Sequence, residues 1–321
     1  MLASSTYPNH ASFVTGLDVA QHRIFTNDIW NGTDFVCSST IGPVGDNIFR
    51  AARRRGLSTA AILGDQTMVG CMAATEAHIH WPPMGELPEG TPVDCLGYAA
   101  NAAVLDALAT SGALDADLLY VHMNDPDSTL HRYGPEAPET IERIREIDDD
   151  LAAVVEMLRP RWNDTVLFVV SDHEQETVNR EAEPIDLVAL LNEAGLPGHA
   201  HNEGTIGIVY DSLGAASMSD LDPLSGAIDL DMNRDGTAIT LVWSERGRVF
   251  GRSKKTGAGQ HGSPRTRTQV ATVSGGHPIV PDLARRIATG FDSSTDRPFA
   301  TDYAHVISGL LGLRLGDDLE Q

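Results

Sequence analysis

Short apolar runs alternate with segments of helical period along most of the chain. Two runs of strand length, 116–123 and 165–171, are almost continuously apolar. Such runs are typical of parallel strands that are covered on both faces. Between them, apolar residues recur every three or four positions over 138–158, which predicts an amphipathic helix. The alternation predicts an α/β fold with a mostly parallel central sheet between helices.

The remaining segments extend this alternation. We expect helices at 45–56, 98–114, 184–195 and 283–311, and strands at 57–63, 205–210 and 269–276. The stretch 217–235 is rich in Asp, Ser and Gly and predicts a loop, whereas 237–243 and 248–251 predict a hairpin. Because no repeat or linker is visible, we expect one domain over 1–321, with about 200–256 forming an inserted hairpin lobe.

One polar stretch resembles a calcium-binding loop. The run Asp231–Gly236 has the D-x-N-x-D-G order of such loops, which require a Glu at the twelfth position and a helix after it. Val242 stands at the twelfth position, and a predicted strand follows. The stretch is therefore interpreted as a polar turn.

The net charge limits the kinds of binding partner, and the cysteine content indicates the redox compartment. The formal net charge is −22, and the only lysines are Lys254 and Lys255. An acidic surface repels polyanions, so neither a nucleic acid polymer nor an anionic membrane is expected as a partner. The cysteines, at 37, 71 and 95, are odd in number and far apart, which favours a reducing compartment such as the cytoplasm. No apolar run has the length of a membrane span.

Candidate chemistry begins with Thr6. This residue stands two positions before Pro8, at the start of a run of helical period over 9–14. Unpaired N–H groups and the positive end of the helix dipole favour an anion there. A threonine that only caps the helix fits the same pattern.

Polar residues also follow both apolar runs, where open α/β sheets place their sites. Asp127 and His131 lie four positions apart, on one face if the segment turns helically, so they can bind one Zn²⁺ together. Asp172 and His173 directly follow the second run. His122 lies inside the first run and is interpreted as a core histidine or a neighbour of a ligand.

These motifs together resemble the nucleotide pyrophosphatase/phosphodiesterase branch of the alkaline phosphatase superfamily. The segment Thr6-Tyr7-Pro8-Asn9-His10, followed by Val14-Thr15-Gly16, resembles its nucleophile segment. Asn27, 27 − 6 = 21 positions later, suits the asparagine that donates to a phosphoryl oxygen. Asp127-x-x-x-His131, Ser171-Asp172-His173 and His261-Gly262 resemble its metal-ligand motifs, with His277 as the competitor of His261.

The resemblance implies an alkaline phosphatase-like fold and a two-metal hydrolase. Asp127, His131 and His261 would hold one zinc ion, and Asp172, His173 and Thr6 the other, with Mn²⁺ as the alternative metal. Thr6 would form a phosphothreonine intermediate, and the substrate would be a small phosphate ester such as a nucleotide. The alternatives are a phosphonoacetate hydrolase or phosphomonoesterase of the same superfamily, and an inactive metal-binding homologue.

Two departures from the family pattern affect these expectations. In the family, an apolar strand that ends in an Asp ligand precedes the nucleophile, whereas only residues 1–5 precede Thr6 here. We therefore expect a truncated chain that lacks this N-terminal strand and leaves two inner sheet edges unpaired. Glu174 stands where many relatives have Gly, which leaves the shape of the substrate pocket open.

Overall fold

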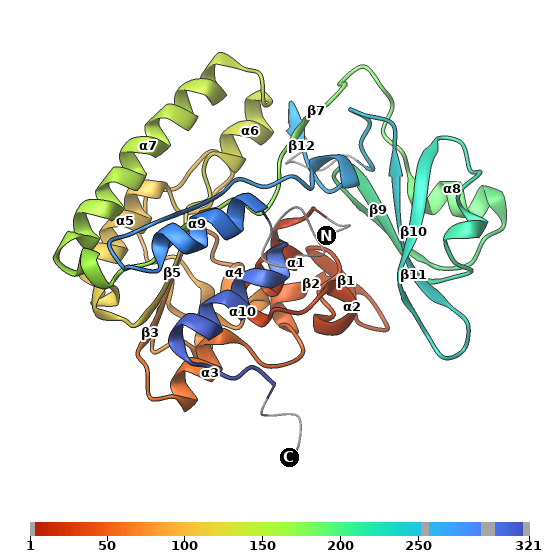
Figure 1. Ribbon diagram of the computed structural model, residues 1–321. Helices are drawn as coiled ribbons and strands as arrows, with labels where there is room; N and C mark the ends of the chain where they lie inside the picture. The colour runs from red at the N-terminus through yellow and green to blue at the C-terminus, as the bar shows by residue number, and fades with distance from the viewer. Residues whose placement is uncertain (1–3, 252–256, 290–298, 317–321) are drawn as a thin grey trace.

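The chain forms an α/β body and an antiparallel lobe. The computed structural model describes residues 4–251, 257–289 and 299–316, with the body and the lobe on opposite sides of helix α1 (Figure 1). Lys254 and Lys255 lie outside the described residues. Among the described residues, no helix is long and apolar enough to cross a membrane.

The strands of the body form two separate sheets. In the first, β3 (Thr59–Leu63) lies between β4 (Ile79–Trp81) and β5 (Leu118–His122), and both pairings are parallel. In the second, β6 (Leu167–Val170) pairs antiparallel with β13 (Ala271–Ser274). The α/β class and the apolar strands 57–63, 116–123 and 165–171 are thus confirmed.

A cavity lies between the two sheets. Within the described part of the chain, β5 and β6 each have one paired edge. Apolar side chains of both strands, of α7 and of α10 line a cavity of about 590 Å³ between them. We call this cavity the inter-sheet slot.

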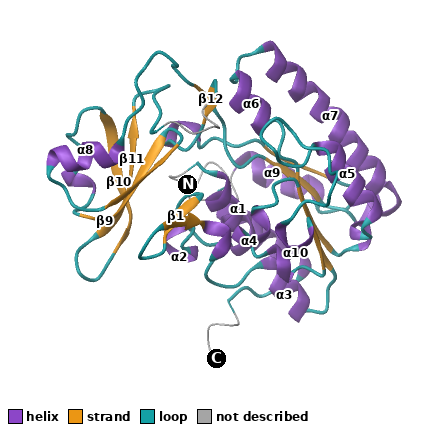
Figure 2. Cartoon of the chain, turned by 180° about the vertical axis from the view of Figure 1, so that it is seen from behind, coloured by secondary structure: helices purple, strands orange, loops and turns teal. Residues whose placement is uncertain are grey.

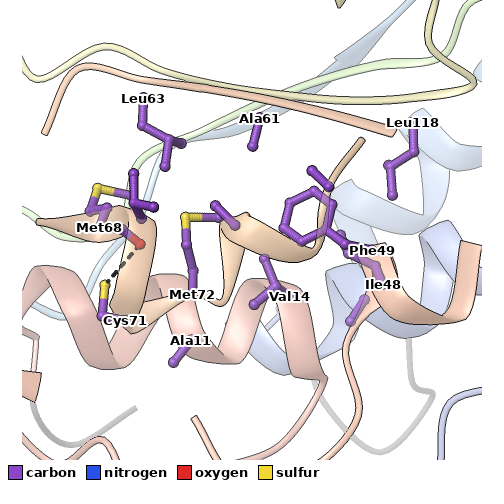
Figure 3. Close-up of a cluster of buried hydrophobic side chains, with 14 of the residues drawn as sticks. Ala11, Val14, Ile48, Phe49, Ala61, Leu63, Met68, Cys71, Met72 and Leu118 are labelled. Carbon is purple, nitrogen blue, oxygen red and sulfur yellow. Dashed lines mark hydrogen bonds between the residues drawn. The ribbon is translucent and has the colours of Figure 1, made fainter. Parts of the chain in front are cut away.

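Helices surround the body sheets on both sides (Figure 2). They are α1 (Thr6–Thr15), α2 (Val19–His22), α3 (Ile48–Arg54), α4 (Met68–Cys71), α5 (Asn101–Thr110), α6 (Asp127–Tyr133), α7 (Pro138–Leu158), α9 (Val280–Thr289) and α10 (Ala300–Leu311). Figure 3 shows how α1 packs: Ala11 and Val14 face Met72 and Phe49, with Leu63 of β3 above them. Burial of this apolar face fixes the helix that begins at Thr6.

The lobe is a four-stranded antiparallel sheet in the order β10-β11-β9-β8. Its strands are β8 (His199–Glu203), β9 (Ile206–Ser212), β10 (Leu224–Met232) and β11 (Ala238–Ser244), and helix α8 (Leu187–Ala194) packs on one face. Buried apolar clusters cover both faces of this sheet. The expectation that the whole chain forms one domain stays a prediction.

The prediction of a hairpin formed by 237–243 and 248–251 is wrong. Strand β11 pairs instead with β10, which lies within the stretch expected to be a loop. Residues 233–237 form the polar turn between these two strands. Arg248–Gly251 contributes only an isolated bridge from Phe250 to Ile185.

Two short strand pairs lie between the lobe and the body. The hairpin of β1 (Asp28–Trp30) and β2 (Phe35–Cys37) lies beside α1, and β7 (Glu176–Thr177) pairs antiparallel with β12 (Gly259–Gln260) (Figure 1). The buried carboxylate of Glu176 on β7 pairs with Arg265 at 2.9 Å. These pairs place the segments after β6 and β12 next to the start of α1.

Candidate metal-dependent active site

Thr6 is the first residue of α1, as the sequence predicts. Its Oγ1 lies 3.2 Å from Nε2 of His173. The side chain of Ser5, at the N-cap position, makes no capping hydrogen bond. The Tyr7 N–H donates to Oδ1 of Asn27 at 3.1 Å, so Asn27 supplies the contact at this helix start. The first turn itself offers few free donors, because Pro8 has no N–H and the Asn9 N–H donates to the Ser5 carbonyl at 3.3 Å.

A second group of residues forms a compact set of metal ligands. Ligand atoms of Asp127, His131 and His261 lie within 4.8 Å of one another. Asp127 and His131 stand one turn apart on α6, with Oδ2 and Nε2 separated by 3.4 Å, and His261 follows β12. His277 lies beyond β13 and is not part of this group.

Three histidines of the site share one hydrogen-bonding pattern. Nδ1 of His131 lies 3.0 Å from the Gly259 carbonyl, Nδ1 of His261 lies 2.9 Å from that of Ser4, and Nδ1 of His173 lies 3.1 Å from that of Glu174. A ring N–H that donates to a carbonyl leaves the other nitrogen as a lone pair. All three rings therefore present Nε2 as a ligand atom. The rings of His173 and His261 stack 3.7 Å apart, so the two ligand groups adjoin.

Asp172 completes the group around Thr6. Its Oδ2 lies 3.3 Å from Nε2 of His173 and 3.5 Å from Nε2 of His10. Although burial raises the pKa of Asp172, His173 and His10 lower it by more, so it falls well below the ordinary aspartate value. Burial, with His173 and His131 nearby, holds the pKa of His261 well below its usual range. Ionised carboxylate and neutral imidazole are the forms that bind a divalent cation.

The donor set of Asp127, His131 and His261 fits a divalent metal ion, and Asp172, His173 and Thr6 lie beside it. Asp127, His131 and His261 supply one oxygen and two nitrogens, and Asp172, His173 and Thr6 supply two oxygens and one nitrogen. Mixed imidazole and carboxylate sets of this kind suit zinc. Thr6, Asp127, Asp172 and His173 also line one end of the inter-sheet slot. The arrangement can therefore bind an anionic group against Thr6.

Several supporting residues were not predicted from the sequence. The Gln175 amide donates to Oδ1 of Asp127, and the Asn9 amide donates to the Asp172 carbonyl at 2.6 Å. Both carboxylate oxygens of Glu203, on β8, accept from the Asn27 N–H, at 3.1 and 3.0 Å. Gln175 stands two residues beyond a motif, and Asn9 lies within one. Glu203 lies in no motif, so no sequence signal marks it.

His78 and His122 lie outside the two ligand groups. Nδ1 of His78 lies 3.0 Å from Oγ1 of Thr59, at the edge of the body sheet. His122 packs edge-on against His10, and no described residue bonds to its buried Nδ1. Burial lowers the pKa of His122 to about 3.

Comparisons with known proteins agree with this geometry. The family model described as type I phosphodiesterase / nucleotide pyrophosphatase matches residues 1–255. Human ectonucleotide pyrophosphatase/phosphodiesterase family member 7 is 30% identical over 192 residues, which cover 55% of this chain and 40% of that protein. Venom phosphodiesterase 2 of Crotalus adamanteus is 26% identical over 194 residues, with coverages of 55% and 22%. The chain thus spans less than half the length of these curated relatives.

Solved structures with the same fold cover almost the whole chain. An inactive form of murine ectonucleotide pyrophosphatase/phosphodiesterase 5 in complex with AMP has a TM-score of 0.66 at 16% identity, covering 98% of this chain and 85% of that one. Phosphonoacetate hydrolase from Sinorhizobium meliloti 1021, in complex with phosphonoformate, has a TM-score of 0.63 at 15% identity, with coverages of 97% and 85%. These likenesses show the alkaline phosphatase-like fold.

Proposed function

The chain belongs to the type I phosphodiesterase / nucleotide pyrophosphatase family, and on that premise we propose that it is a two-zinc phosphodiesterase that acts on small phosphate esters such as nucleotides. One observation carries the proposal: the Thr6 hydroxyl lies 3.2 Å from His173 at the start of α1, next to the Asp127, His131 and His261 group. That is a candidate nucleophile at a helix start, next to candidate metal ligands.

The proposed reaction has two displacement steps. The Thr6 hydroxyl loses its proton and its oxygen attacks phosphorus; the bond to the leaving alkoxide breaks, that oxygen takes up a proton, and a phosphothreonine forms. Water then attacks the same phosphorus, the bond to Thr6 breaks, and the hydroxyl is restored with release of a phosphate monoester. Metal ions, when bound, lower the pKa of the attacking hydroxyl and neutralise charge on the phosphoryl oxygens.

Asn27 stabilises the charged transition state in this proposal. Because Oδ1 of Asn27 accepts from the Tyr7 N–H, its Nδ2 group is directed elsewhere. No described residue accepts a hydrogen bond from Nδ2, which leaves both of its protons for a phosphoryl oxygen. Removal of one such donor from an active site typically lowers kcat by about 10²- to 10³-fold.

A nucleotide is the favoured substrate class, and the choice of metal follows from the ligands. The murine relative was solved with AMP, and a nucleotide diester or pyrophosphate carries the phosphorus centre that Thr6 would attack. Nitrogen from three histidines with carboxylate oxygen favours zinc over Mn²⁺. Metal-depleted protein reloaded with each ion in turn measures that preference.

The test is hydrolysis of bis-p-nitrophenyl phosphate, p-nitrophenyl phosphate and phosphonoacetate by zinc-loaded protein. We expect diester preference, loss of turnover in Thr6→Ala, and retention of measurable turnover in Thr6→Ser, which keeps the hydroxyl. Equally Thr6-dependent preference for the monoester or the phosphonate would assign the chain to those activities instead. Zinc binding without turnover of all three would mark an inactive homologue and refute the proposal.

A further inference from the structure

The lobe contacts the body through a row of three side-chain pairs. On β8, Glu203, His201 and His199 point to the same side, because alternate residues of a strand share a face. They meet Asn27 and the strand β1 that directly follows it. Glu203 accepts from the Asn27 N–H, His201 lies 3.4 Å from the Asp28 carboxylate, and His199 stacks on Trp30 with ring centroids 4.0 Å apart.

The first of these pairs differs from the other two, because it reaches the candidate site. Asn27 is held at both ends of its backbone: its N–H donates to Glu203, and its carbonyl accepts from the Ser38 N–H at 2.9 Å. Its side chain then contacts the start of α1 through the Tyr7 N–H. A chain of contacts thus runs from the lobe through Asn27 to the residue that follows Thr6.

The turn after Glu203 contacts the other half of the site. The Thr205 hydroxyl donates to the His261 carbonyl at 2.9 Å, and the Thr205 N–H donates to the same carbonyl at 3.1 Å. Gly204, with φ of +63°, approaches so closely that an added Cβ would lie 2.7 Å from that carbonyl oxygen. The tip of the β8–β9 hairpin (203–205) is therefore fitted between Asn27 and His261.

Burying the carboxylate of Glu203 costs free energy unless it accepts hydrogen bonds from a partner. Burial raises the pKa of Glu203 above its ordinary value, and the Asn27 N–H and the nearby His201 offset only part of that rise. A carboxylate that accepts from a backbone N–H makes a charge-assisted hydrogen bond, which is stronger than a neutral one. That bond restricts the backbone at the residue whose side chain is to meet the phosphoryl group.

We propose that Glu203 of the lobe is a positioning residue that fixes the backbone of Asn27 and thereby aims its side-chain amide at the phosphoryl group. This inference rests on the proposed function for its catalytic part. Misplacement of a catalytic group by about 1 Å can cost about 100-fold in rate. Glu203→Ala is therefore expected to lower kcat by about 10- to 100-fold with little change in KM, since the effect is on the transition state.

The test is a double-mutant cycle with a direct structural readout beside it. Glu203→Ala is compared in the wild-type and Asn27→Ala backgrounds, with Glu203→Gln, which keeps one acceptor oxygen, as the conservative variant. His199→Ala is the matched control, because it removes another pair of the same row and touches no site residue. Hydrogen exchange of the Asn27 amide, measured by NMR, reports the bond to Glu203 without any substrate.

The expected result has four parts. Glu203→Ala speeds exchange at Asn27 and lowers kcat, Glu203→Gln restores most of kcat, His199→Ala changes neither, and Glu203→Ala adds nothing in the Asn27→Ala background. An equal loss of kcat in both backgrounds, or unchanged exchange at Asn27, would overturn the proposal. Should the wild type turn over no ester, the proposed function fails, and exchange at Asn27 still decides whether Glu203 fixes that backbone.

Discussion

The sheet of the lobe and the sheets of the body differ in how completely their strands are covered. In the lobe, the inner strands β9 and β11 have partners on both edges, and their apolar residues, such as Ile208 and Leu241, are fully buried. In the body, β3 is buried throughout, but β5 and β6 are only partly buried beside the inter-sheet slot.

The two sides of the candidate site are held by regions that differ in this way. Asp127, Asp172 and His173 follow β5 and β6, the strands that border the slot. Asn27 and His261 are contacted by the closely packed lobe. We therefore expect the lobe side of the site to keep its geometry under conditions that loosen the side formed by β5 and β6. The following predictions test that comparison.

The largest expected effect is the loss of stability when a leucine of each sheet is replaced by alanine. Leu241→Ala on β11 should lower the free energy of unfolding by about 3–4 kcal/mol, because Leu241 is fully buried and a cavity remains. Leu119→Ala on β5 should cost about 1–2 kcal/mol, because that side chain already borders the slot. Urea unfolding measures both, and equal losses would remove the distinction between the two sheets.

The second prediction compares two histidines. Nδ1 of His22 accepts from the Ile24 N–H at 3.1 Å, and Nε2 lies 2.9 Å from Oγ of Ser12, whereas Nδ1 of His122 has no partner among the described residues. His22→Leu should cost about 2 kcal/mol because the buried Ile24 N–H loses its acceptor. His122→Leu should cost less than about 1 kcal/mol. A reversed order in thermal unfolding would contradict this.

The third prediction concerns pH. Burial lowers the pKa of His22 from 6.5 to about 4. Between these values the unfolded chain binds the proton and the folded chain does not, so stability falls as pH falls through this window. From pH 7 to pH 4.5 the loss due to His22 is about 2 kcal/mol. Urea midpoints of His22→Leu should therefore decline less steeply over this range than those of the wild type, and an identical decline would show that His22 is protonated in the fold.

The smallest expected effect comes from adding one methylene group. Val169→Ile on β6 extends into the slot and should leave stability unchanged or raise it by up to about 0.8 kcal/mol. Val209→Ile on β9 enlarges a fully buried side chain and should cost about 1 kcal/mol or more. Differential scanning calorimetry of the two variants compares them directly, and destabilisation by Val169→Ile would show that the slot closes in solution.

Much of the body could be predicted from local patterns. The continuous apolar runs gave β5 and β6, and the period of 138–158 gave α7 to the residue. The polar residues after the first run include Asp127 and His131, which the structure brings together with His261. These features depend on neighbours in sequence. The motif order also gave the family, which the family model confirms.

The lobe was harder to predict because its strands form only when segments far apart in the sequence pair with one another. Strand β10 carries Asp229 and Asp231 and two register irregularities, so its sequence resembles a loop until β11 lies beside it. Glu203 is a single acidic residue whose partner, Asn27, is 203 − 27 = 176 positions away. Neither a periodicity nor a motif in the sequence predicts such a contact.

The ligand group on α6 and β12 has a topological consequence. An ion held by Asp127, His131 and His261 would close a loop of 261 − 131 = 130 residues, and that loop contains every strand of the lobe. The entropy lost on closing a chain rises with the logarithm of loop length, and a cross-link removes most of it from the unfolded ensemble. The ion would thus act as a reversible cross-link. Its removal by a chelator would restore the entropy of the unfolded chain and lower the stability of the fold, with no change in the polypeptide.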